Sequence, residues 1–409
     1  MSPAPVLSQL LATDPLLNNL DGGVIVIVLV KTVVAFAALL VSVLLAVWWE
    51  RKLIGYMQSR YGPQEAGPAG VLQSLADGVK AFFKEAFTPQ RADPPVYRLA
   101  PYLAVIPAFL TFAIIPIGGT ITIFGHTTFL QLADPPVGIL WLLAMSGIAI
   151  YGVMLAGWSS GSKYPLLGSV RASAQLISYE AALGLSIAAV VLVSGSLSTR
   201  DIVVQQASRG IGGVLPNWNL IQLAVVPFVV FLIASTAEIN RPPFDLTEAD
   251  SELVAGYMTE YSGISFALFY LAEYMGLINM SAIIVTLFLG GPTGPWRPTG
   301  TVLHWLMPVV WFVIKVFLVV SAFVWARASL PRLRYDQLMD LGWKVLIPVS
   351  LFWLLVIAAI KIGRWPYAFV AAGAGLLGFA LLARAIAVGR ARAEDERRAV
   401  LRRAAGGGG

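Results

Sequence analysis

Residues 24–49, VIVIVLVKTVVAFAALLVSVLLAVWW, decide the class of fold, because Lys31 is their only charged residue. A helix of about 20 mostly apolar residues spans the hydrocarbon core of a bilayer. This stretch therefore predicts a transmembrane helix. Eight further segments meet the same criterion: 99–123, 136–157, 172–194, 218–238, 261–289, 303–326, 345–361 and 366–388. We predict an all-α polytopic membrane protein with about nine transmembrane helices.

The composition of the 409 residues excludes soluble architectures. Hydrophobic residues make up 58% of the chain, charged residues 12%, and the mean hydropathy is +0.78. Soluble domains carry roughly a quarter charged residues, so a surface of this composition would aggregate in water. The chain has no cysteine and two histidines, which excludes a disulfide framework, a thiolate metal site and a histidine-rich haem site.

Lysine and arginine are distributed unequally between the two sides of the predicted membrane domain. With alternating spans, 21 of the 28 basic residues fall on one side and five on the other, while Lys31 and Lys315 lie within spans. Cytoplasmic loops carry the excess of positive charge in membrane proteins. We therefore predict a periplasmic N-terminus and a cytoplasmic C-terminus, which an odd number of spans also requires.

These patterns divide the chain into four parts. They are a periplasmic N-terminal segment (1–23), a membrane domain (24–361), an additional transmembrane helix (362–389) and a charged cytoplasmic tail (390–409). Long structured loops are predicted on the cytoplasmic side at 50–98, 158–171, 238–261 and 327–344. No internal repeat is visible, so the inverted-repeat architecture of secondary transporters has no support.

Two of these loops have patterns of their own. Residues 71–87 place Leu72, Leu75, Val79, Phe82, Phe83 and Phe87 on one helical face, and Asp77, Lys80, Lys84 and Glu85 on the other. This pattern predicts an amphipathic helix in the plane of the membrane interface; the alternative is a loop helix packed on a partner. The loop 327–344 combines arginines with Tyr335, Asp336 and Gln337, and predicts either a docking surface for another protein or only an orientation signal.

Three carboxylates lie within or at the end of predicted spans. They are Glu180, Glu238 and Glu273. A charged residue at the centre of a span costs about 2.5–3.5 kcal/mol on insertion scales. A hydrogen bond to a neighbouring helix would account for any one of them as a structural residue, but the three together indicate proton handling.

An acidic loop continues from Glu238. Residues 238–260 hold six carboxylates, Glu238, Asp245, Glu248, Asp250, Glu252 and Glu260, against the single base Arg241. Glu248 and Glu252 are four residues apart, so on a helix in a dry setting one of the pair would keep its proton. Pro242 and Pro243 prevent the preceding helix from continuing. The pattern predicts a proton relay; the alternative is an ordinary solvated acidic loop.

Motifs for cofactors are absent from the sequence. It has no P-loop, no glycine-rich dinucleotide motif, no HExxH and no catalytic triad arrangement. We therefore predict no nucleotide and no metal bound by this chain, and no redox catalysis by the chain alone.

Four stretches, in order along the chain, resemble one family. They are residues 50–85, beginning ERKLIGYMQSRYGPQ; 156–180, AGWSSGSKYPLLGSVRASAQLISYE; 237–263, AEINRPPFDLTEADSELVAGYMTEYSG; and 327–344, RASLPRLRYDQLMDLGWK. The family is the NuoH-type subunit of respiratory complex I (the H subunit of NADH:quinone oxidoreductase), the counterpart of subunit 1 of the mitochondrial NADH dehydrogenase. The resemblance covers roughly residues 30–345.

The resemblance implies a function. Subunits of this family form the heel of the membrane arm, build most of the membrane side of the quinone chamber, and carry an acidic funnel that links quinone reduction to proton pumping. It implies that quinone is the substrate and that FMN and iron–sulfur clusters belong to partner subunits. Expected partners are soluble connecting-arm subunits at the cytoplasmic loops, small membrane subunits and antiporter-like subunits at the sides, and lipids, but no nucleic acid. The expected location is the bacterial plasma membrane.

The resemblance also assigns residues. The proton-coupling set is Glu180, Glu238, Asp245, Glu248, Asp250, Glu252, Glu260 and Glu273, and the quinone-chamber set is Arg51, Arg60, Asp77, Lys84, Glu85, Arg241, Arg327 and Arg332. The family usually has Glu where Asp250 stands, and the shorter side chain retracts the carboxylate by one methylene. No residue of this chain is assigned a redox role or a metal.

Two other functions are consistent with parts of the pattern. A membrane anchor of an energy-converting hydrogenase or of an F420-type dehydrogenase is related to this family and would differ in its insensitivity to quinone-site inhibitors. An independent secondary transporter would use the buried acids to couple protons to a solute, but it would work as a single chain and lacks the expected repeats.

Overall fold

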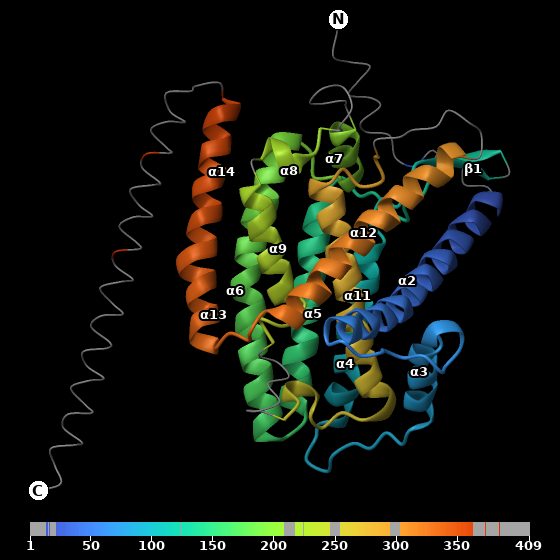
Figure 1. Cartoon of the computed structure of the whole chain (residues 1–409), viewed down its shortest axis with the longest axis vertical. Helices are drawn as coiled ribbons and strands as arrows, with labels where there is room; N and C mark the ends of the chain where they lie inside the picture. Colours follow the sequence, from blue (N-terminus) through green and yellow to red (C-terminus); the bar gives the residue numbers. More distant parts are fainter. Residues whose placement is uncertain are drawn as a thin grey trace, which may run out of the picture.

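A computed structural model describes residues 14, 16, 22–123, 125–207, 217–223, 225–245, 254–294, 303–362, 373 and 384. Figure 1 shows that this part of the chain is mainly helical. Within it, seven helices are long and apolar enough to cross a membrane, and Val226–Glu238 (α9) is a shorter apolar helix. The polytopic helical class is therefore confirmed. The ninth predicted span (366–388) and the charged tail lie outside the described residues.

Long helices make up most of the described chain. They are α2 (Gly22–Met57), α4 (Pro94–Phe112), α5 (Gly138–Ser159), α6 (Lys163–Ser194), α11 (Gly263–Phe288), α12 (Leu303–Ser329), and α13 (Tyr335–Leu341), which continues through a π-helical turn, Gly342–Leu346, into α14 (Ile347–Lys361). The shorter helices are α3 (Gln73–Phe83), α7 (Thr199–Gln206) and α8 (Asn219–Gln222), with single 3-10 turns at Pro68–Gly70 and Gly256–Met258.

The second predicted span, 99–123, was wrong in its extent. Helix α4 ends at Phe112, and the chain then forms an antiparallel hairpin of β1 (Thr120–Ile123) and β2 (His126–Phe129). Pro116 and the Gly118–Gly119 pair disfavour continuation of the helix. The TITI and HTTF segments are rich in β-branched residues, which favour strands.

Several predicted loops are more helical than expected. Only residues 160–162 separate α5 from α6, so the predicted loop 158–171 was wrong, and Arg171 lies within α6. Pro165 lies in the first turn of α6, where its missing N–H costs nothing. The loop 327–344 is mostly the end of α12 and the helix α13, and the span predicted at 345–361 begins already at Tyr335. Conversely, α9 begins only at Val226, after α8.

Helix α11 is the centre of the bundle. Its residues from Leu277 to Phe288 are all buried, with α4, α9, α2 and α12 packed around it. In Figure 1, α2 and α12 run diagonally across the more upright helices, while α14 packs against α6 and α9 at the opposite edge. The small helix α3 contacts α2 and α11.

Lys315 in the middle of α12 fixes the end of α11. Its ammonium donates to the backbone carbonyls of Leu289 (2.6 Å), Gly291 (3.0 Å) and Thr293 (2.6 Å), and it lies 5.1 Å from the ring centre of Trp218. The carbonyls at the end of a helix carry partial negative charge. This basic residue within a predicted span is therefore satisfied by backbone oxygens.

Close contact between α4 and α5 depends on Gly152. A Cβ added there would lie 2.9 Å from the backbone nitrogen of Ala104 and 3.1 Å from the carbonyl oxygen of Ala100. These neighbours are backbone atoms and cannot rotate away. Small residues allow membrane helices to approach at such distances.

We predict that Gly152→Ala destabilises the protein, whereas Gly184→Ala on α6 does not. Both gain about 1 kcal/mol of helix propensity, but only the first adds overpacking, which costs about 1–3 kcal/mol. A Cβ at Gly184 would meet nothing within 4 Å. Thermal unfolding in detergent measures the difference. Equal midpoints for the two variants would contradict the close packing of α4 on α5.

Candidate functional site

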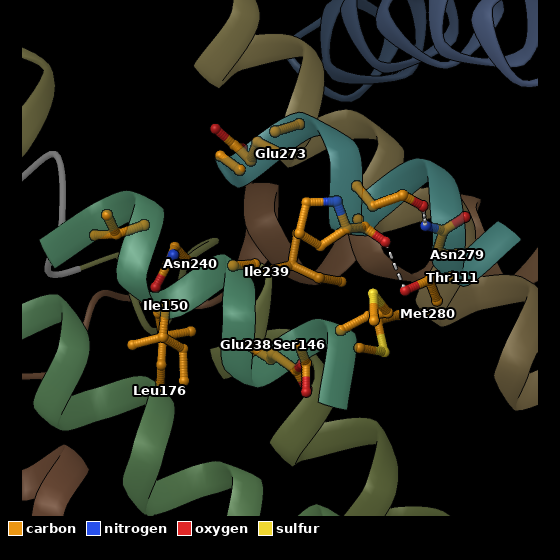
Figure 2. Close-up of a pocket in the computed structure, with 18 of the residues that line it drawn as sticks. Thr111, Ser146, Ile150, Leu176, Glu238, Ile239, Asn240, Glu273, Asn279 and Met280 are labelled. Atoms are coloured by element: carbon orange, nitrogen blue, oxygen red, sulfur yellow. Dashed lines mark hydrogen bonds between the residues drawn. The ribbon is translucent and has the colours of Figure 1, made fainter. Parts of the chain in front are cut away.

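Three acidic residues from different helices line one cavity of about 130 Å³, the acidic cavity. Glu180 comes from α6, Glu238 from the end of α9 and Glu273 from α11. Figure 2 shows Glu238 beside Ser146 and Glu273 at another side of the same cavity. The structure thus brings together the three carboxylates that the sequence places within spans.

Polar groups accompany these acids. The hydroxyl of Ser146 donates to Glu180 at 3.2 Å, and Asn240 and Asn279 are further polar lining residues. Glu238 Oε2 and Asn279 Oδ1 are buried and have no hydrogen-bond partner among the described residues. A cavity of this size has room for several water molecules, and the carboxylates and amides in its otherwise mostly apolar lining offer them hydrogen-bond partners. The lining can therefore support a hydrogen-bonded chain between the carboxylates.

Glu238 is the last residue of α9, and the helix ends there as the Pro242–Pro243 pair predicts. The turn that follows directs Arg241 into the protein. Its side chain is only 3% exposed, although arginine is almost never fully buried unless it is paired.

Arg241 is the centre of a buried ion cluster. Its Nη1 lies 2.7 Å from Glu50 Oε2 and its Nε lies 3.0 Å from Glu273 Oε1. Arg327 donates to the other oxygen of Glu50. The Arg241 guanidinium also lies 4.1 Å from the ring centre of Tyr274. With two arginines and two carboxylates, the cluster is neutral as a whole, which reduces the cost of burying it.

A second, larger cavity of about 580 Å³ also borders this cluster, because Glu50 and Arg327 are among its lining residues. We call it the polar chamber. Its lining includes Glu50, Arg51, Arg60, Tyr270, Tyr274 and Arg327. The hydroxyls of Tyr270 and Tyr274 are 3.1 Å apart. The chamber therefore presents guanidinium and phenol donors to a polar guest.

The wall of the chamber is held to α3 by an ion pair. Arg51 Nη1 lies 2.6 Å from Asp77 Oδ2, and Gln73 donates to the other oxygen at 3.1 Å. Partial burial tends to raise the pKa of the Asp77 carboxyl, but these hydrogen bonds and the charge of Arg51 outweigh it and leave the pKa below its usual value. Asp77 therefore stays ionised at neutral pH and continues to hold α3.

The other predicted site residues lie apart from both cavities or outside the described chain. Lys84, Glu85 and Arg332 are exposed and line neither cavity. Glu260 is half-buried, and its backbone carbonyl accepts from Tyr97 at 2.7 Å; Asp245 lies in the turn after Arg241. Glu248, Asp250 and Glu252 are outside the described residues.

Sequence reasoning missed Glu50, Tyr270, Tyr274, Ser146 and Asn279. Glu50 directly follows the first apolar run, where a charged residue is the normal boundary of a span. Tyr270 and Tyr274 are one helical turn apart and flank Glu273, a spacing that could have indicated a shared polar site. Among the described residues, no three His, Asp or Glu side chains are grouped as a metal site requires.

Comparison with known proteins shows the family of this chain. The sequence model of the family described as NADH dehydrogenase matches residues 30–358. The chain belongs to this family.

The H subunit of the NADH-quinone oxidoreductase of Streptomyces avermitilis is 49% identical over 368 residues, covering 87% of this chain and 79% of the relative. The subunit of the same name from Frankia alni is 50% identical over 351 residues, covering 85% and 76%. The resemblance carried by the four motifs is thereby confirmed, and this member of the family is a multi-pass membrane protein.

We predict that Arg241→Met destabilises this family member by about 3–5 kcal/mol, the usual cost of breaking a buried pair. The loss arises because Glu273 is then left without its cation, so the double variant Arg241→Met with Glu273→Gln should recover part of it. Arg334→Met is the control, since Arg334 is 80% exposed. Thermal unfolding of the detergent-extracted protein measures the stability of all three variants. A double variant no more stable than Arg241→Met would contradict the ion cluster.

Proposed function

We propose that this chain is the membrane subunit of a proton-pumping NADH:quinone oxidoreductase, in which the polar chamber receives the quinone head group and the acidic cavity carries the coupled protons. The names of the two relatives support the enzyme. In this proposal the isolated chain catalyses nothing, because electrons reach the quinone from FMN and iron–sulfur clusters held by partner subunits.

One observation carries the proposal: a single side chain joins the two cavities. Glu50 lines the polar chamber, Glu273 lines the acidic cavity, and Arg241 is ion-paired with both. Charge interactions at 3–4 Å are several-fold stronger inside a protein than in water. A change of charge in the chamber therefore alters the balance at Glu273 without a large movement.

Quinone reduction supplies such a change. The two carbonyl oxygens of a quinone accept hydrogen bonds, and they become more basic as electrons arrive. Arg327 and the phenols of Tyr270 and Tyr274 are among the donors that line the chamber and lie next to the ion cluster. When these donors turn toward the reduced head group, Glu50 loses part of its bond to Arg327 and therefore attracts Arg241 more strongly. Glu273 then has less positive charge beside it and takes up a proton.

The acidic cavity passes this proton onward. Ser146 bonds Glu180 and lies beside Glu238, so a hydroxyl and water can connect the carboxylates in short steps. Chains of this kind are the usual proton paths within membranes. The proposal extends the path through Asp245, Glu248, Asp250, Glu252 and Glu260 at one end and into the small and antiporter-like subunits at the other.

The same proposal also assigns roles to the parts of the chain around the two cavities. Leu72, Leu75, Val79, Phe82, Phe83 and Phe87 on and beside α3 are all exposed, which favours contact with lipid at the membrane interface, where quinone enters. Arg332 and the neighbouring α13 would face the soluble arm on the cytoplasmic side, with the N-terminus periplasmic, in a bacterial plasma membrane. The helix 362–389 would pack against a neighbouring subunit.

Purification through a tag on this chain tests whether the chain is a subunit of an NADH:quinone oxidoreductase. We expect a multi-subunit assembly that reduces quinone with NADH and is blocked by quinone-site inhibitors. A lone chain would refute the proposal. An assembly that evolves hydrogen and ignores quinone would favour the hydrogenase-anchor alternative.

We predict that Glu238→Gln leaves the assembly intact and lowers coupled turnover by about tenfold or more, equivalent to about 1.4 kcal/mol in the barrier. Glutamine keeps the shape of the side chain but cannot carry a proton. The control is Asp201→Asn on α7, since the Asp201 carboxylate accepts from Ser196 and lines neither cavity. Quinone reduction and acidification of inverted membrane vesicles measure the effect. Full proton pumping by Glu238→Gln would exclude Glu238 from the path.

A further inference from the structure

Gln175 on α6 is a fully buried amide that belongs to neither cavity. Its Nε2 donates to the backbone carbonyls of Ala237 (2.7 Å) and Phe244 (2.9 Å), with the side-chain oxygen of Asn240 farther away at 3.4 Å. An amide nitrogen has two hydrogens. The two short bonds use both of them.

The two acceptor carbonyls, of Ala237 and Phe244, lie at the two ends of one turn. Residues 237–244 contain Glu238 of the acidic cavity and Arg241 of the ion cluster, and Asn240 between them has a left-handed backbone (φ 57°). Within the turn, the amide of Phe244 donates to the carbonyl of Arg241 at 2.9 Å. Gln175 therefore joins the two ends of the segment whose middle carries both charged groups.

Other contacts also hold this turn. The amide of Leu333 donates to Pro243 at 3.0 Å, and the Tyr179 hydroxyl donates to Leu338 at 2.9 Å while its ring packs against Phe244. These contacts fix the later part of the turn. Gln175 is the side chain that also reaches Ala237, directly before Glu238.

We propose that Gln175 is a positioning residue for proton coupling: it sets the place of Glu238 relative to Glu180 and Ser146 by holding the turn 237–244 at both ends. This inference rests on the proposed function of the acidic cavity. The role needs a neutral group with two N–H donors, because a charge at this position would be buried and an acceptor would face two carbonyl oxygens.

The variants Gln175→Glu and Gln175→Leu test the role in the assembled enzyme. Ionised glutamate donates nothing and repels the two carbonyls, whereas protonated glutamate keeps one donor. We expect coupled turnover of Gln175→Glu to fall progressively as the pH rises and to recover reversibly as it is lowered. Gln175→Leu should be about tenfold slower at every pH. The KM for quinone should stay within about twofold of wild type, since Gln175 does not line the polar chamber.

The titratable and charged side chains on the elements around position 175 belong to wild type and both variants alike. They are Lys163, Tyr164, Arg171, Tyr179 and Glu180 on α6, Tyr151 on α5, Arg200 and Asp201 on α7, Glu238 on α9, Arg241 and Asp245 in the turn, Tyr257 in the 3-10 turn, Tyr335, Asp336 and Asp340 on α13, Lys344 beyond it, and Lys361 on α14. Subtracting the Gln175→Leu profile from that of Gln175→Glu therefore isolates the new carboxyl group.

Gln206 on α7 is a matched control. It is 1% exposed, its Nε2 donates to the carbonyls of Thr286 (2.9 Å) and Ile202 (3.3 Å), and it lines neither cavity. Gln206→Glu and Gln206→Leu can lower the yield of assembled enzyme, but each assembled enzyme should keep the wild-type pH profile.

Three results would overturn the inference. They are wild-type turnover and pH profile in both Gln175 variants, the same pH dependence in Gln206→Glu, or failure of both Gln175 variants to assemble while the Gln206 variants do, which would make Gln175 purely structural. Failure of the proposed function is distinguishable, because the wild-type assembly would then show no coupled reduction of quinone by NADH.

Discussion

The buried guanidinium of Arg241 is the constraint on which the site depends. A cation that is 3% exposed needs carboxylate partners, and its partners Glu50 and Glu273 lie 191 and 32 residues away in the sequence. The ends of α2 and α9 and the middle of α11 must therefore converge on one point. Glu50 lines the polar chamber and Glu273 lines the acidic cavity, so the ion pairs of Arg241 connect the linings of the two cavities.

The surrounding scaffold keeps that point in place. Helix α11 carries Glu273 and is buried along its second half, Lys315 fixes its far end through three carbonyls, and Gly152 allows α4 and α5 to close beside it. Packed interiors deform little under small forces. In the proposed mechanism, a change of charge in the chamber is therefore transmitted through ion pairs and protons more readily than through movement of whole helices.

Much of this arrangement could be predicted from the sequence, and the failures have physical reasons. Apolar runs predicted the helices, and the cost of intramembrane charge singled out Glu180, Glu238 and Glu273, which line one cavity. Hydropathy does not show where the chain reverses its direction, so residues 113–123, including strand β1, were assigned to a span. Glu50 looked like an ordinary span boundary, because its burial comes from Arg241 and Arg327, which are distant in sequence.

Arg241 matters to the acidic cavity because of the charges that line this cavity. Its described lining includes three carboxylates and no lysine, arginine or histidine. Carboxylates that line one cavity interact with one another and respond as a group to a nearby charge. Arg241 is ion-paired with one of them, Glu273, from outside the lining. In the proposed mechanism, the number of protons that the group holds therefore depends on how strongly Arg241 is drawn toward Glu50, and so on the charge in the chamber.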